Sequence, residues 1–113
     1  MAKYTCTLHG DFDDFLRYFE EELLRSSSSA SVEDGSSYRS GDFRCVSRVY
    51  ERYSFLGGNR VSLTLLLVGS QNEFFFSAIT AGGSQAVFFK LNTLGEESFL
   101  DQAVRIVGQY RSR

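Results

Sequence analysis

The sequence predicts a two-layer α+β domain, in which two helices pack on one face of an antiparallel meander sheet. Between Asp42 and Leu91, short β-branched and aromatic runs alternate with glycine-rich turns, a pattern typical of strands. Two other segments carry apolar residues at helical spacing. With 113 residues, the chain has the length of one domain with one core. The predicted order is β-α-β-β-β-β-β-α, in a single domain that spans residues 1–113.

The first predicted strand and helix follow each other directly. Lys3 to His9 alternates between apolar and polar residues, and Gly10 ends the strand. Asp11 is a good N-cap for a helix that runs to around Arg25. The apolar face of this helix repeats every three to four residues, and it consists of Phe12, Phe15, Leu16, Phe19 and Leu23.

The serine-rich segment that follows allows two interpretations. Residues 26–31 can form a mobile loop or a weak edge strand that ends at the Glu33–Gly35 turn. We assign the edge strand, with Ser36 to Gly41 as a loop.

Four further strands are predicted at Phe43–Phe55, Val61–Val68, Glu73–Thr80 and Gln85–Leu91. A loop at residues 69–72 pairs Leu67 with Phe74, and a loop at residues 81–84 pairs Phe76 with Phe89. Both registers keep the most apolar positions on one face.

The strand at Phe43–Phe55 is harder to orient. Cys45, Val49 and Tyr53 join the apolar face only if the loop around Gly57–Gly58 has an odd length or contains a bulge. The capping box Thr93–Glu96 then opens a C-terminal helix whose apolar stripe begins at Phe99.

The face turned away from the helices is the candidate binding surface. It is too apolar for a solvated face and too charged for a core, which is typical of an interface. The candidate ligand- or partner-binding residues are Arg44, Arg48, Tyr50, Arg52, Leu66, Phe75 and Phe88. By alternation Glu51 falls on the apolar side, where it pairs with an arginine, sits at a bulge or marks a polar cavity.

Composition and charge narrow the classes of function. The net charge of −2 and the pI near 5.3 argue against nucleic acid as the main partner. The N-terminal residues lack the apolar core of a signal peptide, so we expect none, and the longest apolar run is too short for a membrane span. Cys6 and Cys45 are expected to be small buried hydrophobes in a reducing cytoplasm.

No motif specifies catalysis. His9 is the only histidine, and with Cys6 and Cys45 it supplies too few ligands for structural zinc. The segment Gly82–Gln85 lacks the lysine and the following helix of a phosphate-binding P-loop, so it is interpreted as a hairpin turn. We therefore expect no enzyme, no metal and no cofactor.

Three segments carry a resemblance to a known family: Arg48–Tyr53, Asn59–Leu63 and Ser77–Asn92. The chain resembles a family of small uncharacterised bacterial proteins, mainly from Gram-positive anaerobes, which is a domain of unknown function. This resemblance implies no activity and no functional residues. The strand order is also similar to the helix-grip, TATA-binding-protein-like architecture, β-α-β4-α, which serves ligand binding, nucleic-acid binding and scaffolding.

Two functions remain. The first is a non-enzymatic interaction module that forms a homodimer through the arginine- and aromatic-rich sheet face. The second is a small-ligand-binding protein with its pocket between the sheet and the C-terminal helix. A cavity among Phe74, Phe76, Phe89, Phe99 and Val104 would favour the ligand, whereas a filled core with an apolar patch outside it would favour the module.

Overall fold

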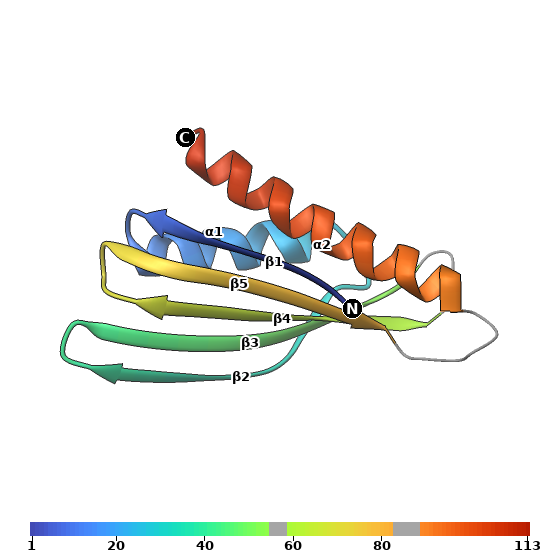
Figure 1. The fold of residues 1–113 in the computed structure, drawn as a ribbon, viewed down its shortest axis with the longest axis horizontal. Coiled ribbons are helices and arrows are strands. Elements are labelled where there is room, and N and C mark those ends of the chain that lie inside the picture. Colours follow the sequence, from blue (N-terminus) through green and yellow to red (C-terminus); the bar gives the residue numbers. More distant parts are fainter. Residues whose placement is uncertain (55–58, 83–88) are drawn as a thin grey trace.

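The computed structural model describes residues 1–54, 59–82 and 89–113, and the side chains of residues 1–54, 59–82 and 95–113 (Figure 1). The elements follow in the order β1 (Ala2–His9), α1 (Phe12–Arg25), β2 (Ser31–Ser40), β3 (Phe43–Tyr53), β4 (Arg60–Gly69), β5 (Glu73–Gly82) and α2 (Phe89–Arg111). The strands form one antiparallel sheet in the order β1-β5-β4-β3-β2. Both helices pack on the same face, so the predicted α+β architecture is confirmed. No helix in the described part of the chain is long and apolar enough to cross a membrane.

The sequence signals for β1 and α1 hold in detail. Asp11 caps α1, because its carboxylate accepts a 2.8 Å hydrogen bond from the backbone N–H of Asp14. The helix ends at Arg25, as its periodicity predicts. Its buried residues are Phe12, Phe15, Phe19 and Leu23. The apolar spacing therefore fixed both the length of this helix and the face that it buries.

The predicted strand at Gln85–Leu91 is wrong where the structure describes it. Residues 89–91 belong to α2, which begins at Phe89 rather than at the Thr93–Glu96 capping box. Residues 85–88 lie outside the described residues. The reason lies in β1, which pairs with β5 from Ala2–Thr80 to His9–Glu73. Because β4 takes the other edge of β5, no edge of β5 is left for a further strand.

Two other predictions need correction. The β2 strand includes Ser36–Ser40, which was expected to be loop, because this polar segment pairs with β3 over its whole length. The β4–β5 hairpin has the expected faces but a register shifted by two residues, so that Leu67 pairs with Phe76 rather than with Phe74. The turn is tighter than expected, since the Ser70 N–H already donates to the Glu73 carbonyl. A shift of two leaves each side chain on its face.

The core is aromatic and lies between the sheet and the helices. Phe76, at the centre of β5, is fully buried, and its ring lies 5.8 Å from that of Phe15 and 5.5 Å from that of Phe19. Phe74 contacts Phe12 and Phe15 in the same way. Such edge-on aromatic contacts add stability beyond the burial of area. One face of the sheet is therefore buried in the core.

Candidate functional site

The structure reverses the predicted orientation of β3. Tyr50 pairs with Leu63 and Val46 with Leu67, so both lie on the helix-covered face, where they are 0% and 1% exposed. The residues between Tyr53 and its partner Arg60 are even in number, which is the opposite of the odd loop that the prediction required. The side of this strand that carries Phe43, Cys45, Val49 and Tyr53 is the more apolar one, so the sequence pattern alone favours the wrong orientation.

The arginines of β3 therefore point toward the helices. Arg44 forms an ion pair with Asp13 of α1. Arg48 lies 3.4 Å from the Glu20 carboxylate, which also accepts a 2.9 Å hydrogen bond from the Tyr50 hydroxyl. The guanidinium of Arg44 holds the pKa of Asp13 below its usual value. These contacts tie β3 to α1, which accounts for charged residues on a covered face.

Arg52 makes a different contact. Its guanidinium lies 4.3 Å from the centre of the Phe99 ring and donates a 3.2 Å hydrogen bond to the Ser98 hydroxyl of α2. Partial burial lowers the pKa of Arg52. Stacking on an aromatic ring is a favourable use of the planar guanidinium. Arg52 thus ties β3 to the second helix.

The predicted binding residues do not form one surface. Arg44, Arg48, Tyr50 and Arg52 lie on the helix side of the sheet, whereas Leu66 and Phe75 lie on the opposite side. Phe88 lies outside the described residues. Whether any of these residues binds a ligand or partner stays a prediction.

We call the side of the sheet turned away from both helices the open face. Within the described ranges, no second layer covers it. Several large side chains on it are exposed, among them Tyr38 at 62%, Phe43 at 44%, Phe75 at 41% and Ile79 at 37%. Its apolar residues are Tyr38, Phe43, Cys45, Val49, Leu66, Val68, Phe75 and Ile79.

The register aligns these residues in transverse rows. One row crosses the sheet from β1 to β2 as Thr7, Phe75, Val68, Cys45 and Tyr38. The ring of Tyr38 also lies 6.3 Å from that of Phe43, its neighbour across the β2–β3 hairpin. The open face therefore has a continuous apolar band.

Charges surround this band. Arg60 lies 2.7 Å from the Glu51 carboxylate and 3.4 Å from the Glu33 carboxylate. Of the three alternatives for Glu51, the structure therefore shows the ion pair with an arginine. The carboxylate of Glu51 raises the pKa of Arg60. His9 lies 2.8 Å from Glu73 at the opposite corner.

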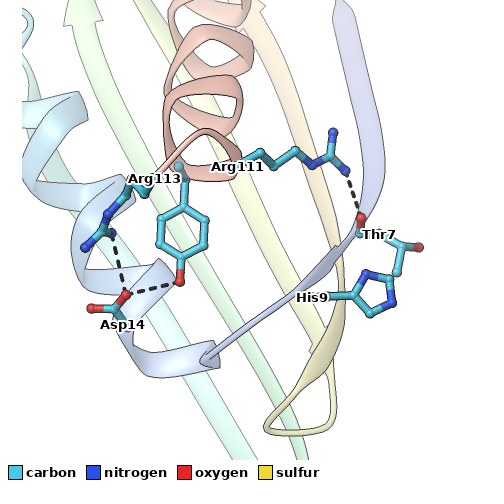
Figure 2. Close-up of a pocket in the computed structure, with 6 residues that line it drawn as sticks. Thr7, His9, Asp14, Arg111 and Arg113 are labelled. Carbon is cyan, nitrogen blue, oxygen red and sulfur yellow. Dashed lines mark hydrogen bonds and ion pairs between the residues drawn. The ribbon is translucent and has the colours of Figure 1, made fainter.

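A polar pocket of about 510 Å³ lies where the C-terminal end of α2 meets β1 and α1 (Figure 2). Asp14 accepts a 3.1 Å hydrogen bond from the Tyr110 hydroxyl and pairs with Arg113 at 3.6 Å. Arg111 donates to the Thr7 carbonyl at 2.8 Å. No sequence pattern signals this pocket, because its residues come from the two ends of the chain: Thr7, His9 and Asp14 on one side, and Tyr110, Arg111 and Arg113 on the other.

The pocket has a cationic character on one side. Figure 2 shows Arg113 next to Asp14, and Arg111 next to Thr7 with His9 on the same side of the pocket. No carboxylate pairs with Arg111 within the described part of the chain, whereas Asp14 neutralises Arg113 in part. The donors fit a small anion rather than a metal ion, and no cluster of three or more metal-ligating side chains occurs among the described residues.

Comparison with known proteins gives a family but no activity. A search of the curated proteins found no match to this chain. The sequence profile of DUF6054, a family of unknown function, matches residues 1–111, and the chain therefore belongs to that family.

Proposed function

We propose that this protein is a non-enzymatic interaction module that forms a homodimer through the open face. The proposal rests on one observation, the contrast between the two sides of the sheet. On the helix side, Phe74, Phe76 and Phe99 are at most 1% exposed. On the open face, Phe75 and Ile79 of the same strand are exposed by more than a third. An exposed apolar band such as the row through Phe75, Val68, Cys45 and Tyr38 is typical of a protein–protein interface.

The composition of the proposed interface differs from the one that the sequence suggests. Leu66 and Phe75 remain in it, and the aromatic pair Tyr38 and Phe43 joins them. The arginines of β3 leave it, because they bind the helices. The proposed interface therefore combines the aromatic residues Tyr38, Phe43 and Phe75 with the aliphatic residues Leu66 and Val68, and charged residues lie at its edges.

The size of the open face supports a second copy of the chain as the occupant. Five strands spaced ~4.8 Å apart and about ten residues long cover an area of roughly 700 Å². Two such faces would bury roughly 1,400 Å² in total, inside the ~1,200–2,000 Å² range of stable protein interfaces. A small ligand would leave most of this face in water.

Phe75→Asp tests the proposal. The side chain is already exposed in the monomer, so the variant should fold normally, but its carboxylate would be buried without a partner in the dimer. We expect a dissociation constant at least about a hundredfold higher, since burial of an unpaired charge costs several kcal/mol. Light scattering coupled to gel filtration measures the change.

Val32→Asp is the matched control for this experiment. Val32 is 43% exposed on a strand of the same sheet, but its pairing with Tyr50 places it on the helix side. This variant should dimerise like the parent. Equal effects of the two substitutions would contradict an interface on the open face.

A second function is supported by the pocket in Figure 2. The alternative of a small-ligand protein places the ligand between the sheet and the C-terminal helix, and this pocket lies between β1 and α2. Its two guanidinium groups favour an anion such as a phosphate or a carboxylate. Titration with inorganic phosphate should then shift the NMR resonances of Thr7 and Tyr110 in the parent but not in Arg111→Gln. Resonances that do not move at millimolar phosphate would remove this alternative.

A further inference from the structure

The open face carries opposite charges at its two edges. One transverse row runs Lys3, Ile79, Thr64, Val49 and Asp34, from β1 at one edge to β2 at the other. Lys3 and Asp34 are both exposed. The row is thus basic at one end, acidic at the other and largely apolar between them.

A bulge in β2 increases the acidity of that edge. The pairing of β2 with β3 shifts between Val32 and Asp34, so that Glu33 is the extra residue. Its carboxylate reaches Arg60 on the open face, and Asp34 pairs with Val49 of the same face. The bulge therefore brings two consecutive carboxylates to the open face, where regular alternation would bring one.

A symmetric dimer can use this face in two ways. A two-fold axis that runs across the strands lays β2 against β2 of the partner, which brings the acidic edges together. An axis parallel to β4, the middle strand, lays β1 against β2 of the partner. In the second arrangement the basic end of each row meets the acidic end of the partner's row.

We infer that two copies pack through their open faces about a two-fold axis parallel to β4, with Lys3 of each copy against the partner's Asp34. This inference rests on the proposed homodimer and specifies how its copies are arranged. The same operation sets Ile79 against the partner's Val49 and Phe75 against the partner's Cys45, so the apolar rows meet as well.

Sheet twist does not break this pairing. Stacked sheets cross at about 30°, which displaces an edge strand by a few ångströms when it lies ~10 Å from the axis. The four-methylene side chain of Lys3 spans such a displacement. Residues on the central strands move less, because these strands lie closer to the axis.

A charge exchange between the edges tests the arrangement. Lys3→Glu alone sets two carboxylates against each other at both ends of the dimer, and Asp34→Lys alone sets two ammonium groups against each other. Each variant should dimerise roughly tenfold more weakly than the parent at low ionic strength. Mixed together, they should form a heterodimer of about parental affinity, because both pairs then have opposite signs.

Native mass spectrometry, with ¹⁵N-labelled Lys3→Glu protein, separates the heterodimer from the two homodimers. Arg39→Glu is the control, since it makes the same change in net charge at an exposed position on the helix side of β2. It should dimerise like the parent. Circular dichroism checks that each variant is folded.

Each of the other outcomes contradicts either the two-fold axis, the Lys3–Asp34 contact or the homodimer. Variants that dimerise weakly and are not rescued by mixing overturn the axis and leave the homodimer intact. Variants that dimerise like the parent overturn the Lys3–Asp34 contact in the same way. A monomeric parent overturns the proposed homodimer itself, and the arrangement with it.

Discussion

The arginines of β3 show how the context of single residues decides their role. In the sequence, Arg44, Arg48 and Arg52 are spaced four residues apart. In a strand this spacing places them on the same face, which we predicted to be exposed. In the structure each meets a partner from a helix: Asp13, Glu20 or the Phe99 ring. Asp13 and Glu20, both on α1, thus make Arg44 and Arg48 tolerable on a covered face.

Tyr50 offers a residue-scale prediction about pH. Burial, reinforced by the Glu20 carboxylate, raises the pKa of the Tyr50 phenol well above its usual value of 10.0. A pKa raised by folding contributes stability that is present below the unfolded pKa and is lost as pH rises past it. The parent should therefore be more stable than Tyr50→Phe at neutral pH, and this difference should shrink above about pH 10.

Denaturant unfolding at several pH values measures this difference. Other tyrosines titrate in the same range, but they are common to both proteins and cancel in the comparison. A difference that stays constant or grows up to the highest accessible pH would contradict the buried, protonated phenol.

At the scale of elements, the sequence predicts what local periodicity controls. The extent of α1 follows from spacing alone. The faces of β4 and β5 follow because the side that carries Leu63, Leu65 and Phe76 is more apolar than the side that carries Ser62, Thr64 and Ser77. The start of α2 does not follow, because Phe89–Leu91 is an apolar run compatible with a strand or a helix. What decides it is the place of β1 beside β5, which depends on contacts between residues about 70 positions apart.

The dependence on long-range strand pairing also explains which residues of the candidate site were predicted correctly. Leu66 and Phe75 were predicted on the open face because they share their side of the sheet with the polar residues Thr64 and Ser77. Tyr50 was misplaced because it shares its side of β3 with three arginines, which makes that side the less apolar one, and only the pairing with β4 orients the strand. The aromatic pair Tyr38 and Phe43 was missed, since Tyr38 sits in a serine-rich segment without a strand signal.

β5 carries the element-scale prediction, because adjacent phenylalanines of this strand point to opposite faces. Phe76→Ala removes a buried ring that contacts Tyr4, Phe15 and Phe19, so it should lower the free energy of unfolding by about 3–5 kcal/mol. Phe75→Ala, on the open face, should cost the monomer less than about 1 kcal/mol. Urea unfolding of the two variants, at concentrations where the parent is monomeric, gives both values.

The comparison is sensitive to the orientation of the whole strand. A larger loss for Phe75→Ala than for Phe76→Ala would show that the faces of β5 are reversed.

At the scale of the whole molecule, the fold buries only one side of its sheet. Two helices cover the face that holds the aromatic core, and the described part of the chain contains no layer for the other. Antiparallel sheets often leave one face in water, but their strands then carry polar residues at the positions that point to that face. Here the row from Phe75 through Val68 and Cys45 to Tyr38 stays apolar across four strands. In the proposed homodimer, a second copy would supply the layer that is missing.

Sedimentation velocity of the unmodified protein over a concentration series tests this account most directly. The open face, with its roughly 1,400 Å² of buried area in a symmetric pair, predicts a shift from monomer to dimer as the concentration rises. At high micromolar concentration the dimer should be the main species. A single monomeric boundary throughout that range would contradict the homodimer.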